Sequence, residues 1–150
     1  MPIKKSEFLI PLSREHHFGL LLVWKIKTGL RKGIESHRIM NYCKWYYENY
    51  LKPHFLFEEL LVFPILGQSE QVRIALSEHK ELTSLFETSS NFEKAVPQIA
   101  SVLEKHIRFE ERELFMEIEK NATADQLKLI QENHDNIVFQ ENTFDIFWEN

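Results

Sequence analysis

The sequence contains little of several features that would point to particular folds or functions. Its one cysteine, Cys43, excludes a disulfide within the chain and a zinc site built from several thiolates. Its four glycines and the lack of alternating apolar runs argue against β-sheet. No stretch approaches the roughly 20 apolar residues of a membrane span, and the apolar run from Phe8 stops at Pro11, too early for a signal peptide. We therefore expect a helical protein of the reducing cytoplasm.

The charge of the chain is mildly acidic. It has 18 basic and 23 acidic residues, a net charge of -5, and no block of basic residues. Neither nucleic acid nor an anionic membrane is therefore an expected partner. At 150 residues with 43% hydrophobic content, the chain can bury a sizeable core but is short for two ordinary domains. We expect one domain over residues 1–150.

Apolar residues recur every three or four positions through most of the sequence, which is the spacing of amphipathic helices. Short connections between such helices favour an all-α, up-down-up-down four-helix bundle with its core in about residues 10–120. Pro53 predicts a kink or a break in the second helix. The four helices are expected from Ser13 to about Arg31, from about Ile34 to Leu66, from Ser69 to about Thr88, and from Phe92 to about Lys120.

Residues 121–150 are expected to add a short C-terminal helix and an aromatic tail. Thr123 and Gln126 have the spacing of a capping box, which predicts a helix that starts there. The tail has too many apolar rings to leave in water. We expect it to pack back on the bundle or, alternatively, to contact another subunit. Its rings are Phe139, Phe144, Phe147 and Trp148.

A ten-residue phrase occurs twice, with the pattern His-x-x-Phe-Glu-Glu-x-x-(Val/Leu)-Phe. The first copy runs from His54 to Phe63 and the second from His106 to Phe115. In each copy the histidine and the first glutamate are four positions apart, so on a helix they share one face. With 7 histidines and 20 glutamates in the chain, chance predicts roughly one such pair. The aromatic and acidic residues that the two copies share around each pair are therefore more informative than the spacing itself.

Helical projection separates inward from outward polar residues. Glu59 turns away from the core. His17 lies outside the apolar face of its helix, but it remains an alternative to His16 as the residue that belongs to the site. The remaining histidines, His134 among them, are expected outside the site. The inward set is His16, His54, Glu58, His79, His106 and Glu110.

Burying this set without compensation would cost several kcal/mol for each charge. Two interpretations remain open. The polar groups satisfy one another inside an ordinary helical core, or they bind a metal. Imidazole and carboxylate without thiolate suit iron, manganese or zinc, and carboxylates that can bridge two cations favour a dinuclear site.

These residues resemble the hemerythrin-like proteins, also called HHE cation-binding domains, over about residues 10–120. The resemblance rests on the inward set and on the two phrases, the first of which extends from Leu51 to Pro64. A relative of that family is a four-helix bundle. The resemblance implies two iron ions bridged by carboxylates, Glu58 and Glu110, with four terminal histidines, His16, His54, His79 and His106.

The sequence departs from the oxygen-carrying hemerythrins at two places. Those proteins have two histidines four positions apart on the third helix. In this chain the residues four positions before and after His79 are Ala75 and Thr83. Their fourth-helix carboxylate lies five residues after the histidine, at Glu111 in this chain, while HHE domains commonly use the four-residue spacing of Glu110. The lone His79 therefore predicts an asymmetric centre with one under-coordinated metal, open to oxygen or water or completed by a carboxylate such as Glu111 or Glu113.

Three functions are consistent with these residues. The first is a di-iron protein that binds oxygen, a related small molecule or iron itself, for sensing, storage or delivery. The second is a redox enzyme at the same centre, for peroxide or nitric oxide turnover or for repair of damaged iron sites. The third is a metal-free helical module whose aromatic tail grips a partner. Metal content separates the third from the others, and turnover with a reductant separates the second from the first.

Overall fold

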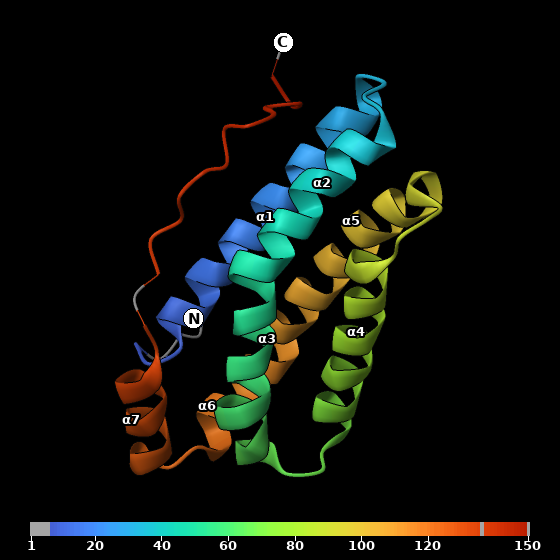
Figure 1. Cartoon of the computed structure of the whole chain (residues 1–150). Helices are drawn as coiled ribbons and strands as arrows, with labels where there is room; N and C mark the ends of the chain where they lie inside the picture. Colours follow the sequence, from blue (N-terminus) through green and yellow to red (C-terminus); the bar gives the residue numbers. More distant parts are fainter. Residues whose placement is uncertain (1–6, 136, 150) are drawn as a thin grey trace.

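The computed structural model describes residues 7–135 and 137–149, and all regular structure in these ranges is helical. Four helical rods stand side by side with alternating direction, which confirms the predicted bundle (Figure 1). The short helix α7 follows the fourth rod. Within the described ranges, no helix combines the length and the apolar character needed to cross a membrane. The rods are α1 (Ile10–Arg31), α2 with α3 (Ser36–Tyr46 and Lys52–Phe57), α4 (Glu70–Glu87), and α5 with α6 (Phe92–Phe109 and Phe115–Asn121), and α7 is Ala124–Asn133.

Two of the rods continue through π-helical turns. The turn Tyr47–Leu51 joins α2 to α3, and the turn Glu110–Leu114 joins α5 to α6. A third π turn, Glu58–Val62, follows α3 and leads into a 3-10 turn, Phe63–Leu66. Pro53 therefore does not break the second rod. It lies just after the first π turn. The wider hydrogen-bond register of that turn accommodates a residue that has no backbone N–H. The rod changes direction at this point (Figure 1).

Two of the three predicted N-caps are confirmed. Ser69 caps α4 by accepting a hydrogen bond from the backbone N–H of Val72, and Thr123 forms the capping box with Gln126 at α7. The prediction for α1 was wrong. That helix begins at Ile10, with a proline in its first turn, where a missing N–H costs nothing. Ser13 instead donates a side-chain hydrogen bond to Glu111.

The interior consists of two apolar clusters with a polar layer at their junction. Along α1, Leu12 belongs to the small cluster and Leu22 to the large one, with His16 between them. Along α4, the same order is Ala75, His79 and Leu82. Because apolar packing closes both sides of this layer, water cannot reach its charges. The small cluster contains Leu9, Leu12, Val62, Phe63, Val72, Ala75, Leu114, Phe115, Ile118 and Ile130.

The tail after α7 runs back along α1 and α2 in an extended form (Figure 1). Phe147 is 1% exposed and lies against Gly29, where a Cβ atom would come within 2.8 Å of its ring. Phe139 and Trp148 pack against the large apolar cluster, which is the first of the two expected arrangements. Phe144 is 95% exposed and does not pack on the bundle of its own chain.

Polar contacts also hold the tail to the bundle. The buried Lys25 Nζ donates hydrogen bonds to Tyr42 Oη at 2.8 Å and to Glu141 Oε2 at 2.5 Å. The guanidinium of Arg38 makes a bidentate ion pair with the carboxylate of Asp145. A buried ammonium group without a partner is costly, so Glu141 compensates a charge that the bundle by itself leaves inside.

We expect F147A to lower the free energy of unfolding by about 3–5 kcal/mol, because it empties a packed site between the tail and α1. The matched control F144A should change it by less than about 0.5 kcal/mol, since that ring is exposed. Urea titrations followed by circular dichroism measure both values. Equal effects of the two substitutions would show that the tail is not packed on the bundle in solution.

Candidate metal centre

The two copies of the repeated phrase take the same local structure. In each, the histidine lies in the last turn of an α-helical segment and the first glutamate is the first residue of the π turn that follows. His54 Nε2 lies 3.3 Å from Glu58 Oε1, and His106 Nε2 lies 2.9 Å from Glu110 Oε1. Both glutamates are 0% exposed. The repeat therefore delivers two matched imidazole and carboxylate pairs into the polar layer.

The other two rods each add one histidine to these pairs. His16 Nε2, from α1, lies 3.1 Å from Glu110 Oε1 and 3.7 Å from Glu58 Oε2. His79 Nε2, from α4, lies 3.2 Å from Glu58 Oε1. His17 is exposed and His16 is buried, so the structure brings His16 and not His17 to the other five residues.

The six residues form two overlapping groups of four. In each group one ligand atom per residue lies within 4.8 Å of all the others, and all the members are buried. Glu58 and Glu110 belong to both groups. The first group adds His16 and His54, and the second adds His79 and His106. Each group therefore has two imidazoles and the same two carboxylates.

This symmetry differs from the asymmetric centre that the lone His79 predicts. His106 lies beside His79, because α5 packs against α4. The two imidazole rings lie 4.8 Å apart. Helical spacing within one sequence segment cannot show such a partner, since the partner comes from another helix.

Several inner atoms of the site are buried without a hydrogen bond. His54 Nε2 lies 3.3 Å and His79 Nε2 lies 3.2 Å from Glu58 Oε1, but these atoms are not aligned to donate and accept. Buried polar atoms are normally paired, so a cluster of unpaired ones needs an explanation. Atoms that point at a common centre are arranged to bind a cation. They are Nε2 of His54, His79 and His106, both carboxylate oxygens of Glu58, and Glu110 Oε2.

A ring of outer glutamates holds the four histidines by their other nitrogen. Each Nδ1 atom lies within hydrogen-bond distance of one carboxylate. A carboxylate only accepts, so it requires the proton on Nδ1 and leaves the inward Nε2 free as a ligand atom. The pairs are His16 with Glu111 at 3.0 Å, His54 with Glu15 at 2.5 Å, His79 with Glu59 at 2.7 Å, and His106 with Glu78 at 2.9 Å.

Sequence reasoning missed this outer ring. It expected Glu59 to turn away from the core and Glu111 to be a possible ligand, and it gave Glu15 and Glu78 no role. A signal was present, because each outer glutamate is the sequence neighbour of an inner residue. Adjacent helical residues point about 100° apart. An inner residue that faces the centre thus directs its neighbour sideways, towards the next helix.

His134, expected outside the site, joins the outer ring from the end of α7. Its Nε2 lies 3.0 Å from Glu15 Oε2, while the other oxygen of Glu15 binds His54. The side chain of His134 is 6% exposed. Glu15 is therefore fixed between two imidazoles, one of which belongs to the polar layer.

The inner carboxylates raise the pKa of the histidines. Burial by itself lowers the pKa of His54, but the charge of Glu58 and the hydrogen bond to Glu15 outweigh it and raise that pKa to about 9. In the same way, Glu110 and Glu78 raise the pKa of His106 to about 10. Burial raises the pKa of Glu58, yet the neighbouring histidines lower it well below its ordinary value. Without a cation the layer holds protons, which a metal ion must displace on binding.

The donor chemistry of the layer fits a metal ion. Imidazole nitrogen and carboxylate oxygen, without thiolate, suit iron, manganese and zinc. A cation would neutralise Glu58 and Glu110, which are sealed from water by the apolar clusters. The buried groups are therefore compatible with a metal-binding site.

Comparison with known proteins agrees with this geometry. The model of the family described as Hemerythrin HHE cation binding domain matches residues 13–118. No curated protein and no solved structure matches the chain. The matched range contains all six inner residues and all four outer glutamates, and it spans more than half of the chain. The chain therefore belongs to the hemerythrin HHE cation-binding domain family.

Proposed function

We propose that the polar layer binds two metal ions, iron in the cell, with Glu58 and Glu110 bridging them. His16 and His54 would be the terminal ligands of one ion, and His79 and His106 those of the other. The observation that supports this proposal is the pair of overlapping groups that share two fully buried carboxylates. A carboxylate has two oxygens and can serve two cations at once, whereas an imidazole offers the layer one nitrogen.

The protein's own residues set the properties of this centre. The outer glutamates fix the rings and raise their basicity, and the apolar clusters keep bulk water out. A carboxylate-bridged pair of iron ions, when bound, supplies redox chemistry and coordination positions for a small molecule. We propose that the protein binds oxygen, a related small molecule or iron itself, for sensing, storage or delivery. The single buried thiol of Cys43 supports a reducing compartment, the cytoplasm.

The metal-free interaction module has less support. In that hypothesis the aromatic tail grips a partner. Phe139 and Phe147 instead pack on the bundle of their own chain, and Trp148 lies beside them. Three of the four rings are therefore already used to hold the tail in place, and only Phe144 is left exposed.

After aerobic purification we expect about two iron ions per chain and a near-ultraviolet band from the bridged ferric pair. Elemental analysis and absorption spectroscopy measure these. Zinc or manganese in place of iron would revise the identity of the metal and not the site. Protein that retains no metal after loading with ferrous iron under reducing conditions would contradict the proposal.

Substituting the bridging Glu58 should lower metal content far more than substituting its neighbour Glu59. E58A removes an oxygen donor from both ions, so binding of both should fail. E59A removes only the partner of His79 Nδ1. It should therefore weaken affinity by about 10–100-fold while keeping two ions per chain at saturating metal. Titration with ferrous iron distinguishes lost sites from weakened sites. Equal losses in both variants would contradict the assignment of inner and outer carboxylates.

The adjacent histidines on α1, His16 and His17, provide a second pair of matched substitutions. H16A should reduce bound metal, because it removes one of two imidazoles from the first group of ligand atoms. H17A should bind metal as the unchanged protein does, since His17 is exposed. Metal content after dialysis measures both. Loss of metal in H17A with retention in H16A would reverse the assignment.

A further inference from the structure

The outer glutamates close the polar layer towards solvent. Apolar packing covers the layer at both ends, so a cation from solution has to enter between the rods, past a histidine and its outer glutamate. The four outer side chains differ in how far solvent reaches them. Their exposed fractions are 9% for Glu15, 11% for Glu78, 26% for Glu111 and 40% for Glu59. Glu59 is therefore the outer glutamate that is most accessible to an ion in solution.

A surface groove lies between α4 and the π turn that contains Glu59. Its volume is about 510 Å³, which accommodates a divalent cation together with its water shell. Its lining carries two carboxylates, Glu59 and Glu87, and one ammonium group, Lys80. The groove is therefore negative on balance, and a negative groove raises the local concentration of cations.

His79 connects this groove to the polar layer. On the groove side, its Nδ1 atom lies 2.7 Å from Glu59 Oε2. Its other nitrogen, Nε2, lies 3.2 Å from Glu58 Oε1 inside the layer. One imidazole ring therefore joins an exposed carboxylate to a fully buried one.

The contact between Glu59 and His79 contains the donor atoms of a cation site. A carboxylate oxygen and an imidazole nitrogen share a proton there, and a cation that replaces the proton would be bound by both atoms. Among the described residues, His79 is the only hydrogen-bond partner of the Glu59 carboxylate, whereas Glu15 and Glu111 each have a second partner. Because Glu59 combines exposure with a single contact, its carboxylate can turn easily towards an incoming ion.

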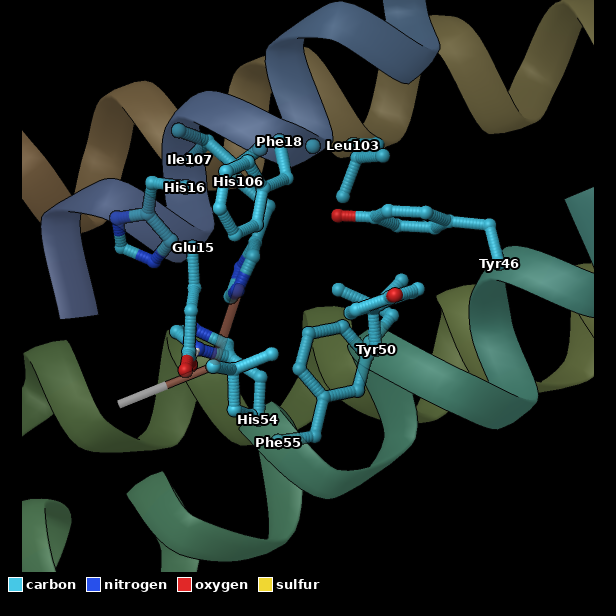
Figure 2. Close-up of a pocket in the computed structure, with 13 residues that line it drawn as sticks. Glu15, His16, Phe18, Tyr46, Tyr50, His54, Phe55, Leu103, His106 and Ile107 are labelled. Atoms are coloured by element: carbon cyan, nitrogen blue, oxygen red, sulfur yellow. Dashed lines mark hydrogen bonds and ion pairs between the residues drawn. The ribbon is translucent and has the colours of Figure 1, made fainter. Parts of the chain in front are cut away.

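The space between α1, α2 and α5 on the other side of the site residues is much smaller. The cavity beside His16, His54 and His106 has a volume of about 10 Å³, which is room for one water-sized molecule (Figure 2). Aromatic side chains such as Tyr50 surround it (Figure 2), and Ile137 of the tail also lines it. A cation that still carries several waters is too large for this space.

We propose that the groove is the loading port of the polar layer, through which a hydrated divalent cation such as ferrous iron enters and leaves. Glu59 is its first ligand, and His79 Nδ1 is the second. The proposal rests on the proposed function, since the cation that passes the port is the one that the inner residues bind. In the port the cation exchanges water for a carboxylate oxygen and an imidazole nitrogen, and the proton of Nδ1 passes to solvent.

The first test fills the groove from Ser84, an exposed lining residue on α4. A port alters the path of the cation and not its bound state. In S84W, loading and release of ferrous iron should therefore both slow by about tenfold, while affinity and the two ions per chain stay unchanged. The matched control is S101W, at an exposed serine on α5 in a groove whose lining contains none of the six inner residues. A coloured ferrous chelator, added at set times without oxygen, measures both rates.

The outcomes of this test separate the port from the metal centre. Two ions per chain with unaltered rates in S84W would overturn the port and leave the centre in place. Equal slowing in S84W and S101W would also overturn it, because the effect would not depend on the groove. An unchanged protein that binds no iron would refute the centre and the port together.

The second test removes the charge of the first ligand. E59Q keeps the shape of the side chain and an oxygen that can accept from His79 Nδ1, but it no longer attracts a cation. Ferrous iron loading should slow by roughly tenfold. The matched control E81Q removes the same charge from an exposed position on α4 outside the groove lining, and it should load as the unchanged protein does. Equal loading rates in E59Q and E81Q would contradict the role of Glu59.

Discussion

The burial of two carboxylates, Glu58 and Glu110, at the centre of the bundle is the constraint on which the rest of the structure depends. Both are 0% exposed, and apolar clusters close the layer on either side. An ionised carboxylate in such a place is tolerated only with compensating charge. Four imidazoles surround the pair, and a ring of glutamates in turn orients the imidazoles. The polar layer is an arrangement of alternating charge that a cation would complete.

The backbone of the bundle is irregular where these carboxylates enter it. Glu58 and Glu110 each open a π turn, and a third π turn precedes Pro53 in the second rod. A π turn widens the helix locally and changes which side chains face the core. The repeated phrase thus contributes its glutamates at corresponding points of two rods. The apolar residues on either side keep those points opposite each other.

The segment after α7 gives this member of the family features that lie outside its matched domain. His134 fixes the carboxylate that orients His54, and Ile137 closes the cavity beside the layer. The tail is anchored by the buried ring of Phe147 and by Glu141, which binds the buried Lys25. The same segment therefore stabilises the bundle and encloses its interior site.

The sequence by itself indicated the helices and five of the six inward residues, because these follow from local periodicity and capping, and short connections indicated the alternating direction of the helices. It left His16 and His17 as rivals on the first helix. It also indicated the family through the repeated phrase. Only the tertiary structure decided that His79 is matched by His106 and that Glu15, Glu59, Glu78 and Glu111 hold the histidines from outside. It likewise decided that Phe144 is exposed and that His134 reaches Glu15. Each of these contacts joins side chains from different segments, and helical spacing records only which residues share a face of one helix.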